Sequence, residues 1–304
     1  MTAGQKMRLS VLNFFGTAIQ SLGFSGVTRL GRFMGRLLWH ILPSRRKLAV
    51  DNIMSHLGKS RDEAKRIAYE SFCQNGCSFL EIVLTKNFGL DSPQLRFDPP
   101  ELFEALKNCQ RPIVAATAHF GSWELLASLL GQVYEAPRPR MVVVRSYPDP
   151  AVQTFIASCR EATGAEMVGH RQAVMSVIRA LHKNGIAAFL VDHNAMSREA
   201  VFIPFLGEEA AVNAGPALLA VRGNALVWPV VLVREGQDYV FRLQAPLDTA
   251  ELSGTREEKI LQTAKFYTRA IEKFIEEHPE QWFWMHERWK TKFNARKKFR
   301  NREQ

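Results

Sequence analysis

Apolar residues follow two different periods along this chain, and the alternation between them predicts its elements. Short, nearly continuous apolar runs are typical of strands that helices cover on both faces, whereas apolar positions at helical spacing are typical of amphipathic helices. Strands are therefore predicted at residues 112–118, 140–145, 186–192, 225–234 and 238–244. Helices are predicted at residues 61–84, 101–108, 122–132, 150–162, 171–184, 215–222 and 255–277.

The order of these elements predicts an α/β fold. Strands that alternate with helices form a mostly parallel sheet with helices on both sides. The turn at Gly236 joins two strands directly and adds an antiparallel pair at the edge, so the sheet is expected to be mixed. A chain of 304 residues, 46% of them hydrophobic, has ample material for a buried core.

The N-terminal residues have a different pattern, which indicates contact with a membrane. Residues 9–28 contain no charged side chain, and their 20 positions are long enough to cross a bilayer. They also contain three glycines and several polar residues, which favours a position in the interface over a full span. The residues that follow alternate apolar positions with Arg29, Arg32 and Arg36 on another face, as in a basic amphipathic helix.

The net charge of +10 is concentrated at the two ends of the chain. Residues 1–60 carry nine Lys or Arg against one acid, and residues 287–304 carry eight against two. Basic ends fit an anionic lipid surface or a nucleic acid. The apolar helices beside the N-terminal charges favour lipid, and no nucleic-acid partner is expected. The predicted organisation is membrane-associating helices at 1–44, an α/β domain at 45–290 and a basic tail at 291–304.

The candidate chemistry centres on the hexapeptide His-Phe-Gly-Ser-Trp-Glu at residues 119–124. His119 ends a predicted strand, Gly121 allows the chain to turn, Ser122 is a candidate N-cap, and Glu124 falls on the first helical turn. A histidine acts as a base when its second ring nitrogen has a partner, and Glu124 is the expected partner. Backbone N–H groups near Gly121 and Ser122 are candidate oxyanion donors. The alternative is a histidine at a strand end beside a glutamate placed favourably on a helix dipole.

Two further polar residues follow predicted strands and belong at the same sheet edge. Arg145 comes directly after an apolar strand and could hold a phosphate or sugar oxygen through two hydrogen bonds, or form a surface ion pair. Asp192 ends another strand and could orient a loop or an acceptor hydroxyl, or form a simple turn. The four cysteines do not follow zinc-site spacing, so no metal is expected.

The hexapeptide resembles the H-x4-D/E motif of the lysophospholipid acyltransferase superfamily, in particular the branch of bacterial lipid A biosynthesis (lauroyl/myristoyl) acyltransferases. Further stretches that match in order are Arg145, the segments 192–194 and 201–207, and the C-terminal segment 278–290. Ser122 departs from the pattern, because many relatives place asparagine there. Residues 212–215 also depart from a threonine-containing version.

This resemblance implies an O-acyltransferase that moves a fatty acyl chain from a thioester to a hydroxyl group of an anionic glycolipid such as a lipid A precursor. The implied donor is acyl-acyl carrier protein or acyl-CoA, used as a co-substrate without any cofactor. The implied location is the cytoplasmic face of the bacterial inner membrane, with a monotopic or single N-terminal anchor. A phosphatidylinositol mannoside or lysophospholipid acceptor, a hydrolase and a non-catalytic lipid-binding protein are the alternatives.

Overall fold

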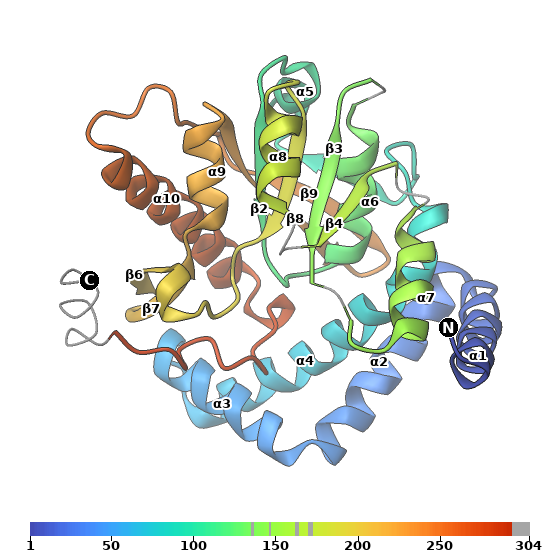
Figure 1. The fold of residues 1–304 in the computed structure, drawn as a ribbon. Helices are drawn as coiled ribbons and strands as arrows, with labels where there is room; N and C mark the ends of the chain where they lie inside the picture. The colour runs from blue at the N-terminus through green and yellow to red at the C-terminus, as the bar shows by residue number, and fades with distance from the viewer. Residues whose placement is uncertain (135–136, 146, 162–163, 170–172, 294–304) are drawn as a thin grey trace.

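A twisted sheet forms the centre of the computed structural model, which describes residues 1–134, 137–145, 147–161, 164–169 and 173–293 (Figure 1). Its strand order is β1-β9-β8-β2-β5-β3-β4, and β10 pairs with β8. Only the pairs of β8 with β9 and with β10 are antiparallel among these strands. The strands are β1 (Leu95–Asp98), β2 (Ile113–Thr117), β3 (Arg140–Val144), β4 (Glu166–Gly169), β5 (Ile186–Leu190), β8 (Leu226–Glu235), β9 (Asp238–Leu243) and β10 (Leu247–Asp248).

Helices cover both faces of this sheet, which confirms the predicted fold class. One face packs against α8 (Ala173–Leu181), α9 (Gly215–Arg222) and α10 (Arg256–Glu277). The other packs against η1 (Glu81–Asn87), α5 (Pro100–Asn108), α6 (Trp123–Gln132) and α7 (Pro150–Glu161). Successive residues of β2 alternate between the two faces and all five are buried, which explains its continuous apolar sequence.

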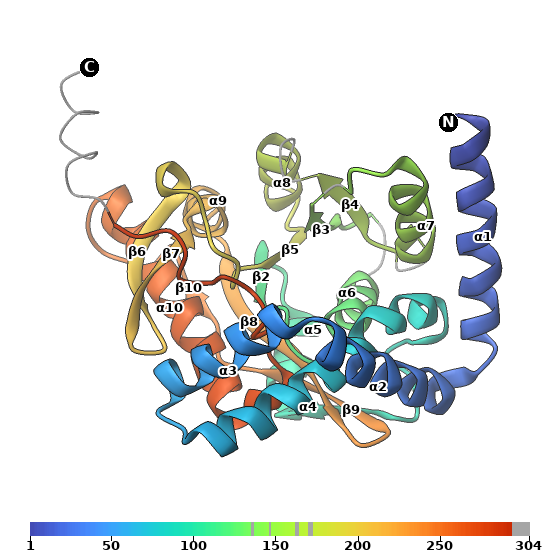
Figure 2. The same cartoon turned by 90° about the horizontal axis from the view of Figure 1, so that it is seen from below.

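The N-terminal third of the chain forms helices that lie beside and below the sheet. These are α1 (Ala3–Gln20), α2 (Gly23–Ile41), α3 (Pro43–Leu57) and α4 (Arg61–Leu80). Helices α2, α3 and α4 run across one end of the sheet, whereas α1 stands at the periphery (Figure 2). The apolar stretch 9–28 is therefore divided between two helices, and no helix in the described ranges is long and apolar enough to cross a bilayer.

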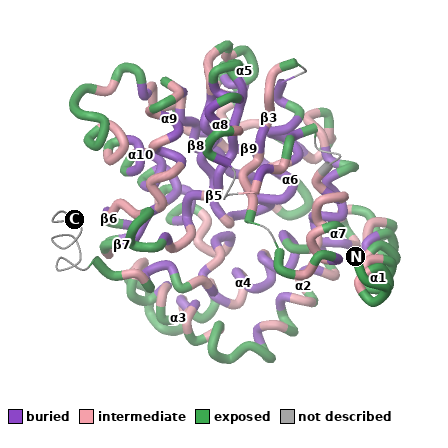
Figure 3. The backbone as a smooth tube through the Cα atoms, in the orientation of Figure 1, coloured by how far each residue is buried: buried purple, intermediate pink, exposed green. Residues whose placement is uncertain are grey.

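Helix α2 packs on α4 at unusually short range because three glycines face one another. A Cβ atom at Gly35 would lie 2.2 Å from the carbonyl oxygen of Phe72, and one at Gly76 would lie 2.2 Å from the carbonyl oxygen of Gly31. Only residues without a side chain allow the two backbones to approach this closely. The contact leaves the opposite face of α2 exposed, and much of α1 is exposed as well (Figure 3).

Two differences from the predicted elements affect the site. The segment 201–207 is part of an antiparallel hairpin of β6 (Ala200–Phe205) and β7 (Glu208–Asn213), separate from the main sheet. The predicted antiparallel edge strand β9 is not at the edge, because β1 pairs with it in parallel. The unpredicted strands β1 and β4 have four residues each, too few for a clear periodic signal.

Candidate functional site

His119 lies just beyond the C-terminal end of β2, as the apolar pattern predicts. Its main chain is fixed on two sides, because its N–H donates to Asp192 Oδ2 (3.0 Å) and its carbonyl accepts from the N–H of Phe283 (3.1 Å). Its side chain remains 34% exposed. The imidazole is thus held by a rigid frame but is accessible to a second molecule.

The carboxylate that contacts the imidazole is Asp192, which follows β5, the strand next to β2. Asp192 Oδ1 lies 3.0 Å from Nδ1 of His119, and Oδ2 accepts from Nε1 of Trp282 (2.8 Å). Burial raises the pKa of Asp192, but the charge of His119 and the hydrogen bonds together hold it far below the usual range. Burial lowers the pKa of His119, and the charge and hydrogen bond of Asp192 outweigh this effect and raise it.

Glu124 does not make the contact with His119 that the sequence analysis assigned to it. Its carboxylate forms a two-pronged ion pair with Arg160 of α7, at 2.9 Å from Nε and 2.6 Å from Nη2. The first turn of α6 directs this side chain toward α7. The H-x4-E spacing therefore places the imidazole and the Glu124 carboxylate near the site, but they form no hydrogen bond with each other. Glu124 still acts on His119 through its charge, which adds to the increase in the pKa of the imidazole.

The backbone N–H groups of Gly121 and Ser122 are also engaged elsewhere. Gly121 donates to the carbonyl of Gln281 (3.0 Å), and Ser122 donates to the carbonyl of Leu232 (2.8 Å). These two N–H groups are therefore already paired within the protein, and free oxyanion donors must come from their neighbours. Gly121 itself is required, because its φ is +54° and a Cβ would lie 2.0 Å from the carbonyl oxygen of Leu232.

An apolar surface adjoins the imidazole. The rings of Trp123 and Phe283 lie 5.7 and 6.3 Å from the ring of His119, and Phe79 of α4 packs edge-on against both of those aromatic rings. Behind Trp123 is a cavity of about 40 Å³ between α6 and the sheet. Its lining is mostly apolar and includes Leu126, Leu130, Val142, Val144 and Ala188, together with Thr117, Glu124 and Arg160.

Arg145 follows β3 at the same sheet edge and is exposed. No hydrogen bond or ion pair joins it to another residue in the described part of the chain, so its proposed contact with a substrate remains a prediction. Two functional residues were not predicted from the sequence, Arg160 and Trp282. Arg160 gives no signal within its helix, and Trp282 stands out only as part of the matched segment 278–290, although its indole N–H needs a partner.

The fold and the site together define an α/β protein with a partly exposed histidine–aspartate pair at the carboxyl edge of its parallel strands. The sequence profile of the family "Bacterial lipid A biosynthesis acyltransferase" matches residues 4–291. The chain therefore belongs to this family of acyltransferase enzymes.

Individual relatives are consistent with this assignment. The chain is 26% identical to the lipid A biosynthesis lauroyltransferase of Escherichia coli K12, over 90% of this chain and 88% of that protein. It is also 26% identical to the lipid A biosynthesis palmitoleoyltransferase of E. coli K12, over 86% and 84%. A phosphatidylinositol mannoside acyltransferase of Mycolicibacterium smegmatis is 29% identical over half of each chain.

Among solved structures, the chain is similar to the 1-acyl-sn-glycerophosphate acyltransferase PlsC of Thermotoga maritima. The match has a TM-score of 0.38 and 12% sequence identity, and it covers 92% of this chain and 99% of that one.

Proposed function

We propose that the protein transfers a fatty acyl group from an acyl thioester to a hydroxyl group of a lipid A precursor, with His119 as the general base. The observation that carries this proposal is the contact between His119 Nδ1 and Asp192, at 3.0 Å. It fixes one tautomer and leaves Nε2 of a partly exposed ring as the proton acceptor.

In this reaction, Nε2 of His119 removes the proton from the acceptor hydroxyl while that oxygen attacks the thioester carbonyl. Asp192 stabilises the imidazolium that forms. The tetrahedral intermediate then collapses, the carbon–sulfur bond breaks, and the departing sulfur takes the proton from His119. The products are an ester and a free thiol. Glu124, paired with Arg160, contributes a second and more distant negative charge that favours the imidazolium.

The oxyanion is bound by the first-turn N–H groups of α6 in this proposal. The N–H groups of Trp123, Glu124 and Leu125 have no hydrogen-bond partner among the described residues. They lie at the positive end of a helix dipole, where the motif ends. The cavity behind Trp123 supplies apolar surroundings for the first methylene groups of the donor chain.

The two substrates are assigned from charge and from the relatives. The lauroyltransferase and palmitoleoyltransferase relatives support a lipid A precursor as the acceptor, and Arg145 is placed to contact one of its polar oxygens. Acyl-acyl carrier protein is the proposed donor, because the net charge of +10 on the chain can attract an acidic carrier, with acyl-CoA as the alternative. The partial match to a mannoside acyltransferase supports a phosphatidylinositol mannoside as the alternative acceptor.

The protein binds the cytoplasmic face of the inner membrane in this proposal, through α1 and α2. Large apolar side chains are exposed along one face of each helix, and Arg29 and Arg36 are exposed near those of α2. Such a face fits an anionic lipid surface. The exposed apolar residues of the two helices are Met7, Val11, Phe14, Phe15, Phe33, Leu37 and Ile41.

Replacing Phe14 and Phe33 by Ser is expected to weaken membrane binding about tenfold or more, because each side chain would lose its burial in lipid. The measurement is co-sedimentation with vesicles of phosphatidylglycerol and phosphatidylethanolamine. Met175→Ser is the matched control, because Met175 is equally exposed (61%) but lies on α8. Equal sedimentation of the double variant and the wild type would contradict this membrane contact.

Mass spectrometry of membrane lipids from bacteria with and without the protein tests the function itself. We expect the protein to add the mass of one acyl group to lipid A species, with a corresponding loss of the acceptor. A shift confined to mannosides or lysophospholipids would assign a different acceptor to the same chemistry. If no lipid changes in mass and only free fatty acid accumulates, the transferase assignment fails and a hydrolase takes its place.

A further inference from the structure

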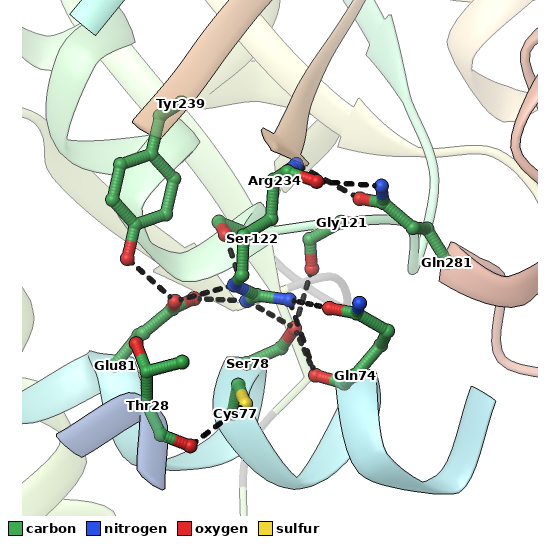
Figure 4. A network of polar contacts seen from close by, with 10 residues as sticks. All are labelled: Thr28, Gln74, Cys77, Ser78, Glu81, Gly121, Ser122, Arg234, Tyr239 and Gln281. Atoms are coloured by element: carbon green, nitrogen blue, oxygen red, sulfur yellow. Dashed lines mark hydrogen bonds and ion pairs between the residues drawn. The ribbon is translucent and has the colours of Figure 1, made fainter. Parts of the chain in front are cut away.

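A buried arginine lies directly beneath the His119–Glu124 turn, and the proposed chemistry does not use it (Figure 4). Arg234 is near the end of β8 and is 5% exposed. Its Nε and Nη2 atoms lie 3.0 and 2.7 Å from the two carboxylate oxygens of Glu81, and Tyr239 donates a further hydrogen bond to the same carboxylate. The charge of this arginine is therefore fully compensated inside the core.

Nη1 of Arg234 donates to the side chain and the carbonyl of Gln74 on α4, and other contacts lead to the catalytic turn. Its Nη2 donates to Oγ of Ser122 (2.8 Å) and to Oγ of Ser78 (3.2 Å). Ser78 in turn donates to the carbonyl of Gly121. The side chain of Gln281 pairs with both the N–H and the carbonyl of Arg234, at 2.9 Å each. Figure 4 shows the Glu81 carboxylate and the hydroxyls of Ser122 and Ser78 around the guanidinium, with Gln281 at the main chain of Arg234.

Ser122 stands at the N-cap of α6 but does not cap the helix. Three other helices of this chain begin with capping boxes at Thr2, Ser60 and Thr255, where ψ is between 157° and 165° and the hydroxyl accepts an N–H from the first turn. At Ser122, ψ is 60° and the hydroxyl accepts from Arg234 instead. The residue type suited to capping α6 is thus present, but its side chain is held elsewhere.

Two kinds of unpaired polar group lie at or near the cavity that Trp123 and Glu124 line. The first-turn N–H groups of Trp123, Glu124 and Leu125 have no partner among the described residues. Oγ1 of Thr117, a residue only 6% exposed, also has none in the described part of the chain, and Thr117 lines the cavity with Trp123 and Glu124. Because buried polar groups are normally paired, such a group indicates a ligand that supplies the missing partner.

We propose that Arg234 is a positioning residue, which holds the Ser122 hydroxyl away from the first turn of α6 and so keeps its N–H groups available to the oxyanion of the reaction. The inference rests on the proposed function. Without the arginine, ψ of Ser122 can rotate from 60° into the range of the capped helices, and the hydroxyl then accepts the N–H of Leu125 and occupies the oxyanion position. Arg234 thereby determines whether the motif is followed by a capped helix or by a binding site.

The proposal is tested with a set of variants, one of which should lose kcat and another of which should regain it. Arg234→Met combined with Glu81→Leu removes both buried charges together, which is often neutral for folding, whereas removing one alone would leave a buried charge unpaired. We expect this pair to lower kcat about 10²-fold at a nearly unchanged KM, which is the effect of losing oxyanion donors. Adding Ser122→Ala should restore most of kcat, because no hydroxyl is left to cap the helix.

Three controls separate positioning from general stability. Ser122→Ala alone should keep kcat within about threefold of the wild type, since the N–H groups stay free. Arg111→Met removes another two-pronged arginine–carboxylate pair, with Asp248, at the opposite end of β2, and should leave kcat unchanged. If the double variant does not fold, Arg234→Lys keeps a positive charge beside Glu81 and should show the same loss and the same rescue.

A crystal structure of the Arg234→Met, Glu81→Leu variant gives a readout that does not depend on activity. We expect Oγ of Ser122 at about 3.0 Å from the backbone nitrogen of Leu125. Wild-type kcat in the double variant, no gain on adding Ser122→Ala, or a Ser122 hydroxyl that remains away from the helix would each overturn the proposal. Failure of the wild type itself to transfer acyl groups would instead refute the proposed function.

Discussion

Replacing His119 by Ala is expected to lower acyl transfer by about 10²- to 10⁴-fold, the usual contribution of a general base. Neither nearby carboxylate can take its place, because Glu124 is paired with Arg160 and Asp192 is buried. The measurement is initial-rate transfer from a radiolabelled acyl thioester to purified acceptor, with vesicle binding measured in parallel. Binding should be unchanged, since α1 and α2 do not contact the imidazole.

His182→Ala is the matched control for this variant. His182 is an exposed histidine just after α8 and makes no contact with the motif, so its loss should leave transfer unchanged. Circular dichroism must show that the His119 variant is folded, because Asp192 loses a partner there. Turnover within a few-fold of the wild type in a folded His119→Ala protein would refute the base assignment.

Replacing Asp192 by Asn is expected to reduce kcat by about 10²- to 10⁴-fold and to change its pH dependence. The carboxylate fixes the tautomer of His119, and an amide of the same shape does not. Transfer requires the unprotonated imidazole, so activity falls as pH drops through the pKa of His119. Asp192 raises that pKa in the wild type, and burial lowers it. Without the negative charge, the acidic limb of the pH profile should therefore move to lower pH.

The Glu124→Gln variant distinguishes the effect of Glu124 on His119 from that of Asp192. Because Glu124 contacts Arg160 and reaches His119 only through its charge, its replacement should move the acidic limb in the same direction but by less. The measurement is kcat against pH for the three proteins under saturating substrate. A larger displacement in the Glu124 variant than in the Asp192 variant would reverse the assignment of the orienting residue.

Some features of the fold and the site follow from short stretches of the sequence. The strand before His119 can be predicted because both of its faces are buried, so all of its residues except Thr117 are apolar. Polar groups tend to gather where parallel strands end. Asp192 follows another predicted strand, so it could be placed at the same edge as His119. Both inferences need only the order of the elements and their periodicity.

The partner of each charge could not be predicted, because it depends on side-chain direction and on distant segments. Glu124 is five residues from His119 in sequence, yet it turns to Arg160, whereas Asp192 reaches the imidazole from another strand. Arg234 comes at the end of an apolar run and directly before Glu235, and nothing local distinguishes it from a surface residue. Its burial follows from Glu81, which is 153 positions away in the chain.

If α2 rests on a membrane, its close backbone contact with α4 fixes the position of the site relative to the lipid. Gly35 and Gly76 bring the two helices together without intervening side chains, and two residues after Gly76 the hydroxyl of Ser78 holds the carbonyl of Gly121. Helix α4 thus lies between the helix that would rest on lipid and the turn that carries His119. The height of the imidazole above the headgroups is then a fixed dimension of the enzyme, and the acceptor hydroxyl must be presented at that height.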